Sequence, residues 1–246
     1  MVDLGELVPV PSRGRVFQGR RRVRLGDVSP AGRLRLDALA RYLQDVSNDD
    51  TRDAGMSDEL TWVVRRVVLE VERFPVLGEE LMLRTFCGGT GPRWAERRVS
   101  VEGDGGGRAE AATLWVHVDE AGRPALLPEG FMEHFGEAAG GRTVRARLRH
   151  GDAPSAAATS PWALRFADFD VLGHVNNAAY WAPVEECLAV RRHLRAPLRA
   201  ELEFRTALEV GASVALRSVD GEDGSLALWI TDGQLVSASA VVRPWP

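Results

Sequence analysis

The chain has 246 residues, of which 45% are hydrophobic, and a formal net charge of -4. This length suits one large domain or two small ones, and the negative charge argues against nucleic acid as the main partner. No apolar run approaches the roughly 18 residues that a membrane span needs. The N-terminus is acidic and lacks the basic-then-apolar layout of a secretory signal, so we expect a cytoplasmic protein.

Cysteine and histidine are too scattered along the chain to predict a metal site. Cys87 and Cys187 are far apart and show neither metal-ligand spacing nor a disulfide framework. The five histidines are equally dispersed: His117, His134, His150, His174 and His193. We therefore expect no metal and no cofactor.

The first half of the chain predicts a strand, a turn and a long helix, followed by a run of strands. Alternating apolar and polar side chains mark strands over residues 66–72, 81–86 and 98–102. The glycines of residues 105–107 predict a tight hairpin before a further strand over residues 111–119.

The second half of the chain repeats the first. Residues 24–34 align without gaps with residues 165–175, and residues 69–84 align with residues 202–217. Two such blocks in the same order indicate an internal duplication. In the first of these alignments, Arg24, Asp27 and Gly32 are identical to Arg165, Asp168 and Gly173. When the same alignment is continued without gaps, Gln44 falls on Glu185.

The order of elements, strand-helix-strand-strand-strand, therefore occurs twice. It favours an α+β fold in which antiparallel sheets wrap around helices. A small and polar stretch over residues 150–161 is typical of an extended connector. We expect an N-terminal domain over residues 1–140, a linker over 141–160 and a C-terminal domain over 161–246.

The most informative segment is residues 168–180. It places Asp168, Asp170, a glycine and His174 ahead of an apolar, helix-like run from Ala178 to Leu188. The N-terminus of a helix attracts negative charge through unpaired N–H groups and an aligned dipole. A hydrolase needs such donors where a carbonyl oxygen becomes an oxyanion.

The order acid-x-x-Gly-His-Val-Asn-Asn-x-x-Tyr resembles the active-site segment of hotdog-fold thioesterases, including the 4-hydroxybenzoyl-CoA type. Residues 17–55, 62–65 and 71–78 resemble the first half of acyl-ACP thioesterases. The resemblance implies a tandem double hotdog that hydrolyses a fatty acyl thioester, carried by acyl carrier protein (ACP) in fatty acid biosynthesis, to free acid and thiol.

The motif residues suggest roles in such a reaction. Asp170 is the candidate carboxylate that attacks the carbonyl or activates water, and His174 would orient the thioester or share the proton. Backbone N–H groups around Asn176 and Asn177 would hold the oxyanion, although Asn176 could equally be the N-cap of the helix. Asp168 resembles an acid that stabilises a turn.

Two polar groups that are usual in acyl-ACP thioesterases are missing. The position two residues before the histidine, usually Asn, is Leu172, and a Glu usually found in a later strand is replaced by Ala207. Glu209 lies two residues further on and would face the same side by strand alternation, so it could substitute. Glu185 or Glu186, within the predicted helix, could contribute an acid to the reaction. At helical spacing one of the two is expected to face solvent or to pair with Arg191 or Arg192 at the helix end, and this structural role is favoured.

An acyl chain needs an apolar tunnel, which is simplest between the helix and the sheet of the first half. Candidate lining residues, each more typical of an ordinary core than of a tunnel, are Leu43, Trp62, Val64, Leu69, Val71 and Phe74. Because ACP is acidic, its enzyme should present positive charge. The densest arginine groups lie in residues 20–22 and 191–195, but CoA phosphates would also favour arginine.

The prediction is an acyl-ACP thioesterase. The alternatives are an acyl-CoA thioesterase, dehydration of a 3-hydroxyacyl thioester, and a degenerate hotdog that binds acyl thioesters without hydrolysing them. Leu172 and Ala207 are the features that favour the last. The duplication supplies a pair of hotdogs in one chain, so both a monomer and a homodimer are open.

Overall fold

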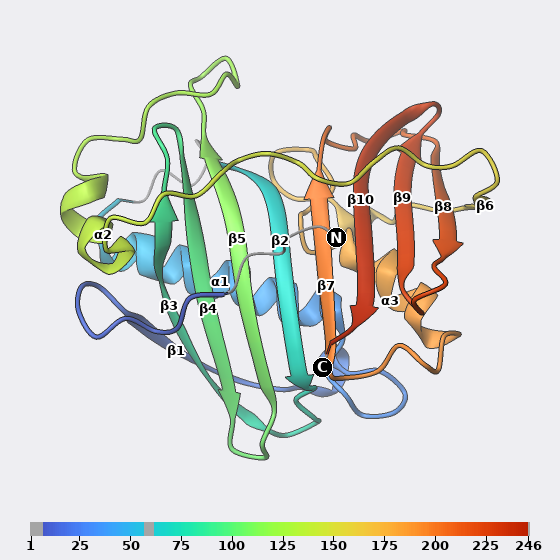
Figure 1. The fold of residues 1–246 in the computed structure, drawn as a ribbon, viewed down its shortest axis with the longest axis horizontal. Coiled ribbons are helices and arrows are strands. Elements are labelled where there is room, and N and C mark those ends of the chain that lie inside the picture. The colour runs from blue at the N-terminus through green and yellow to red at the C-terminus, as the bar shows by residue number, and fades with distance from the viewer. Residues whose placement is uncertain (1–6, 57–61, 246) are drawn as a thin grey trace.

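The structure, a computed structural model, describes residues 7–56 and 62–245. Within these ranges, ten strands form one sheet accompanied by three α-helices (Figure 1). The strands are β1 (Phe17–Arg22), β2 (Trp62–Arg73), β3 (Glu80–Thr90), β4 (Trp94–Gly103), β5 (Arg108–His117), β6 (Ala158–Pro161), β7 (Leu198–Phe204), β8 (Val214–Asp220), β9 (Leu226–Asp232) and β10 (Leu235–Pro244). The helices are α1 (Leu36–Asp53), α2 (Phe131–Ala139) and α3 (Trp181–Ala189), with short 3-10 helices η1 (Leu25–Asp27) and η3 (Phe166–Asp168).

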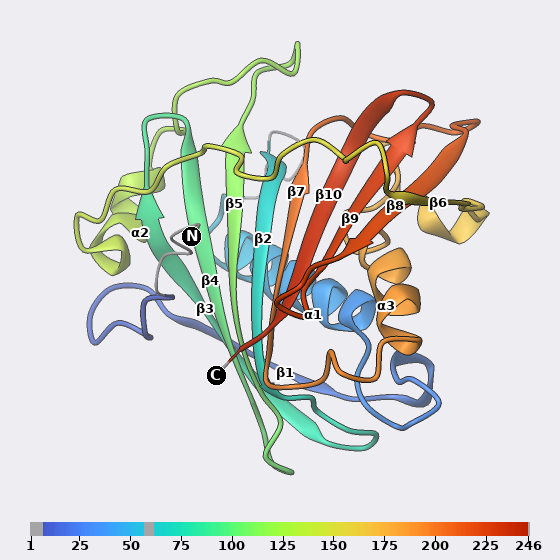
Figure 2. The same cartoon turned by 45° about the vertical axis from the view of Figure 1, so that its right-hand side comes forward.

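The sheet runs through both halves of the chain. Its strand order is β1-β3-β4-β5-β2-β7-β10-β9-β8-β6, and the halves join where β2 pairs antiparallel with β7. The sheet curves around α1 and α3, which lie on the same face and contact each other (Figures 1 and 2). The expected α+β architecture, in which antiparallel strands wrap a helix in each half, is confirmed.

Helix α1 is held by its apolar face. Leu36, Leu39, Leu43 and Val46 recur at helical spacing and are buried in the shared core. Arg41, on the opposite face, is exposed. Because this apolar stripe packs against the curved sheet, α1 is fixed along its length and can position polar residues toward a site.

The internal repeat is present in the structure. In both halves a 3-10 helix ends in an aspartate, Asp27 or Asp168, whose carboxylate accepts a hydrogen bond from the backbone N–H three residues earlier. Each is followed by an isolated β-bridge and by a glycine, Gly32 (φ 79°) or Gly173 (φ 76°). Only glycine adopts such a left-handed conformation without strain, so the duplicated turn explains why this residue recurs.

Three details differ from the sequence predictions. Helix α3 begins at Trp181, so the residues from Ala178 to Tyr180 form turns instead of helix. Strand β7 ends at Phe204, so Ala207 and Glu209 lie beyond it, and strand alternation does not relate them. Strand β6 begins at Ala158, inside the predicted linker. Because both halves share one sheet, the boundaries between the domains stay a prediction.

The connector between the halves covers the face of the sheet opposite α1. It runs from α2 across the strands to β6 and is drawn in yellow in Figure 1. None of the described helices is both long and apolar enough to cross a membrane. The cytoplasmic location stays a prediction.

Candidate active site

The motif loop between η3 and α3 is fixed by Asp168. This carboxylate is 4% exposed and accepts hydrogen bonds from the backbone N–H of Arg165 (2.8 Å) and from its guanidinium (2.7 Å). Asp27 holds the matching turn in the first half, where Tyr42 also donates to it (2.6 Å). Asp168 therefore shapes the loop, as the sequence predicted.

Asp170 is oriented by the loop that it begins. Its Oδ1 accepts a hydrogen bond from the backbone N–H of Leu172 (3.0 Å), and its Oδ2 lies 3.4 Å from Nδ2 of Asn176. The backbone closes the turn as well, since the N–H of Asp170 donates to the carbonyl of His174 (3.0 Å). Each carboxylate oxygen therefore keeps a lone pair for a further partner.

A cavity of about 520 Å³ lies between this loop and the first half of the chain. Such a volume is in the range of sites that enclose a small organic ligand. Asp170, Leu172, Asn176 and Asn177 line it from the loop. The other lining residues come from α1, the ends of β2 to β5 and the region around α2: Gln44, Ser47, Asn48, Thr51, Gly55, Met56, Trp62, Cys87, Ala95, Glu96, Arg97, Trp115, His117, Pro128, Phe131 and Phe135.

The far part of the cavity is mainly aromatic. The ring of Phe131 contacts those of Trp62 (5.6 Å between centroids) and Phe135 (5.1 Å) in tilted orientations. Cys87 lies among them, and burial raises the pKa of its thiol to about 11. Of the tunnel candidates predicted from the sequence, only Trp62 lines this cavity; Leu43 and Val64 line an adjoining space of about 30 Å³, and Leu69, Val71 and Phe74 belong to the core.

Asn176 and Asn177 differ in whether their backbone N–H groups donate hydrogen bonds within the protein. The N–H of Asn176 donates to the carbonyl of Asp168 (2.8 Å), and its side chain accepts from the N–H of Ala178 (3.0 Å), which stabilises the turn. The N-cap of α3 is Tyr180, so Asn176 is not the N-cap that the sequence allowed. Among the described residues, the N–H of Asn177 has no acceptor. An uncommitted donor thus sits on the cavity wall near Asp170.

In the first half, the backbone N–H at the position that corresponds to Asn177 has an acceptor. There the residue that corresponds to Asn177 is Leu36, and its N–H donates to the carboxylate of Glu185 (3.1 Å). Arg33, the counterpart of His174, pairs with the same carboxylate (2.6 Å) and lies over the ring of Phe74. Of the two glutamates of α3, Glu186 is exposed, as expected for one of them, whereas Glu185 is buried and joins the two halves.

His174 and Glu209 lie outside the cavity wall. Their backbones form an isolated bridge, whose counterpart in the first half joins Arg33 and Val76. The contact is thus a feature of the duplicated fold. His174 is half-buried, whereas Glu209 is exposed, so the structure brings together Asp170, Asn176 and Asn177 but leaves these two at the edge.

Two residues that the sequence reasoning missed face the motif from α1. Gln44 and Asn48 are one helical turn apart and line the cavity, and their side chains make no hydrogen bond among the described residues. Ser47, beside them, donates to the carbonyl of Leu43 (2.7 Å). The available signal was polar amides on an otherwise apolar helix face.

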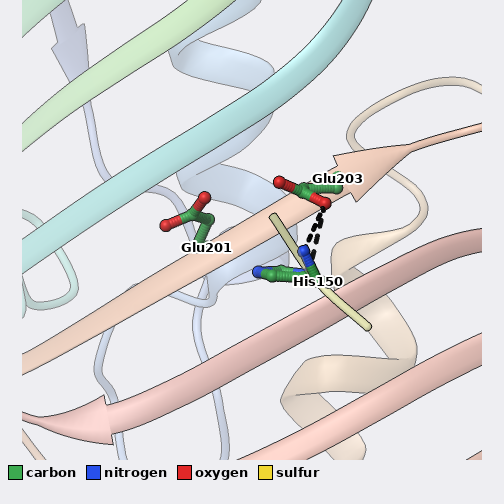
Figure 3. Close-up of side chains that lie close together, drawn as sticks. All are labelled: His150, Glu201 and Glu203. Carbon is green, nitrogen blue, oxygen red and sulfur yellow. Dashed lines mark hydrogen bonds and ion pairs between the residues drawn. The ribbon is translucent and has the colours of Figure 1, made fainter. Parts of the chain in front are cut away.

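One trio of described residues has the spacing of metal ligands, and none of its members lines this cavity. His150 of the connector meets Glu201 and Glu203 of β7 (Figure 3). The backbone N–H of His150 donates to Glu203 (3.0 Å), and Nδ1 contacts Ser239. Arg66 lies 3.8 Å from Glu201 and provides a counter-charge, so we assign the trio to fastening the connector.

Two solved structures with the same architecture are ACP thioesterases. The 12:0-ACP thioesterase from Umbellularia californica is 21% identical, with a TM-score of 0.78 over 95% of this chain and 98% of its own. An acyl-ACP thioesterase from Bacteroides thetaiotaomicron is 16% identical, with a TM-score of 0.74 over 93% and 97%. The shared fold is the double hotdog, and the chain is a thioester hydrolase of that fold.

Sequence comparisons identify the family of thioesterases to which the chain belongs. Residues 14–135 match the model of the acyl-ACP thioesterase N-terminal domain, and residues 151–233 match that of the C-terminal domain. The chain belongs to the acyl-ACP thioesterase family. Uncharacterized proteins MT2057 and Rv2001, from two strains of Mycobacterium tuberculosis, are each 31% identical to it over 244 residues, which is 98% of this chain and 97% of theirs.

Proposed function

We propose that this thioester hydrolase releases fatty acids from acyl-ACP in fatty acid biosynthesis, with Asp170 as the general base. The observation that carries the proposal is that Asp170 lines the same cavity as Asn177, whose N–H has no acceptor among the described residues. Hydrolysis needs a group that activates water and a donor that holds the oxyanion. These two groups supply both requirements from one loop.

The reaction balances without a cofactor. Asp170 takes a proton from a water molecule whose oxygen attacks the thioester carbonyl carbon, and the carbonyl oxygen becomes an oxyanion that accepts from the N–H of Asn177. The tetrahedral intermediate then collapses as the C–S bond breaks, and the proton passes to the departing sulfur. A thiol with a pKa of about 8.5 leaves readily, so the site needs no strong acid.

The acyl chain would extend from the motif loop toward the aromatic residues between α1, α2 and the sheet. Burial of its methylene groups against Trp62, Phe131 and Phe135 would contribute about 0.8 kcal/mol for each methylene. His174 and Glu209, which lie at the edge of the site, are proposed to support the loop and its entrance. Their replacement should cost less turnover than replacement of Asp170.

The choice of ACP as carrier rests on the family match. The arginine groups predicted to attract an acidic carrier are partly neutralised within the chain, since Arg20 and Arg22 face Glu80 and Arg191 pairs with Asp220. An acyl-CoA thioesterase is therefore the second candidate, and the carrier must be measured directly.

The test is thiol release from acyl-ACP and acyl-CoA substrates of short to long chain length, with Asp170→Asn beside the wild type. The substitution should lower turnover at least ~100-fold. The matched control is Ser29→Ala, at the same position of the first-half repeat, which should keep normal turnover. Near-normal hydrolysis by Asp170→Asn would refute the general base, and preference for CoA would refute the carrier.

A further inference from the structure

Gln44 of α1 lines two neighbouring cavities. It is half-buried and lines both the main cavity and the small adjoining space, and Asn177 lines both with it. Its side-chain amide makes no hydrogen bond among the described residues. An amide carries two donors and an acceptor, so Gln44 presents uncommitted polar groups to the wall that holds the N–H of Asn177.

The residue that corresponds to Gln44 in the internal repeat makes a hydrogen bond across the two halves. The register that matches Asp27 with Asp168 also matches Gln44 with Glu185. Glu185 reaches across from α3 to the start of α1, where its carboxylate accepts from the N–H of Leu36. Leu36 is the counterpart of Asn177, so the structure contains a negatively charged oxygen at the first-half equivalent of the proposed oxyanion site.

We infer that Gln44 is a catalytic residue that donates a second hydrogen bond to the oxyanion, beside the N–H of Asn177. This inference rests on the proposed function. At the first-half site, the carboxylate of Glu185 reaches over from the second half and fills the anion position permanently. At the second-half site, Gln44 of the first half carries an amide of the same length, which leaves the position open and adds a donor.

This assignment also accounts for the polar group missing from the motif. The amide expected two residues before His174 is replaced by Leu172, which is 52% exposed and cannot donate from its side chain. Gln44 brings an amide to the same loop from the opposite half of the molecule. The active site is then shared between the two hotdogs, with the base on one half and a donor on the other.

The chemistry predicts a specific kinetic effect. A donor aimed at the oxyanion acts mainly in the transition state, so its loss lowers kcat with little change in KM. Removal of one oxyanion donor typically costs about 10²–10³-fold in kcat. A residue that only lined the acyl pocket would instead raise KM.

The experiment compares Gln44→Ala and Gln44→Glu with the wild type. We expect Gln44→Ala to lower kcat by about 100-fold at nearly constant KM. Gln44→Glu should be at least as impaired, because a carboxylate cannot donate and would accept from the N–H of Asn177 as Glu185 does in the other half. The matched control is Asp45→Ala, the next residue of α1, which is exposed and does not line the cavity, and which should keep the wild-type kcat.

The outcomes separate the two proposals. Wild-type protein that releases no thiol from any substrate would refute the proposed function. Wild-type protein that does so, while Gln44→Ala and Gln44→Glu keep its kcat, would refute the role of Gln44 alone. Thermal unfolding of each variant serves as a check on folding, and a fall in kcat without a fall in melting temperature supports the catalytic role.

Discussion

Replacement of Glu185 by alanine tests whether the two halves are joined as the structure indicates. The carboxylate is 7% exposed and accepts from the Arg33 guanidinium (2.6 Å) and from the N–H of Leu36 (3.1 Å). Its removal leaves the buried N–H of Leu36 without an acceptor, which costs about 1–3 kcal/mol. The lost ion pair adds about 1 kcal/mol, because Arg33 keeps partial contact with solvent and with Phe74.

The free energy of unfolding should therefore fall by about 2–4 kcal/mol, a decrease in melting temperature on the order of 10 °C for a chain of this size. Urea and thermal unfolding followed by circular dichroism measure both quantities. Glu186→Ala is the matched control, because Glu186 is exposed on the same helix and should change stability by less than about 0.5 kcal/mol. Equal stability of the two variants would refute the assigned interhelical contact.

Three further predictions concern the loop, the cavity and pH. Gly173→Ala and Gly32→Ala each place a side chain at positive φ with open space around it, so both should cost about 1 kcal/mol in urea unfolding, but only Gly173→Ala should also lower thiol release. Burial raises the pKa of Cys87 to about 11, so iodoacetamide at pH 8 should alkylate it at least ~100-fold more slowly in the native than in the unfolded chain, as read by mass spectrometry; equal rates would contradict its burial. Burial alone would raise the pKa of Asp37, but hydrogen bonds from two arginines lower it below 3.8. Its charge thus stabilises the fold above pH 3.8 and less so below, and the stability deficit of Asp37→Asn should shrink between pH 7 and pH 3; a deficit that does not change with pH would contradict the pairing.

The parts of the fold that the sequence predicted depend on local patterns. The turn that carries Asp27 and Gly32 recurs with Asp168 and Gly173, and the structure shows the same backbone at both. The hairpin at residues 105–107 likewise joins β4 to β5. Such features follow from residues within a few positions of one another, where turn geometry restricts the choice of amino acid.

The features that escaped prediction depend on contacts between distant residues. The burial of Glu185 follows from Arg33, which is 152 positions away in the chain. The exposure of Glu209 follows from the end of β7, where pairing with β10 and β2 stops. No local pattern encodes these contacts, because they arise only when the halves form one sheet.

The candidate site also contains residues that a local motif predicts and residues that only the packing of distant segments brings together. Asp170, Asn176 and Asn177 were predicted from a short motif and lie together on the cavity wall. Gln44 and Asn48 belong to a helix more than a hundred positions earlier, and their sequence context marks only an amphipathic helix. Their placement opposite the motif is a consequence of the packing of α1 against α3.

The most direct test of the account is a crystal structure of the protein with an acyl-pantetheine ketone, in which a methylene replaces the thioester sulfur and hydrolysis is blocked. We expect the ketone oxygen within hydrogen-bond distance of the Asn177 N–H, the Asp170 carboxylate beside the carbonyl carbon, and the acyl chain among Trp62, Phe131 and Phe135. An analogue bound with its carbonyl away from Asp170 and Asn177 would contradict the central claim that this cavity wall performs the hydrolysis.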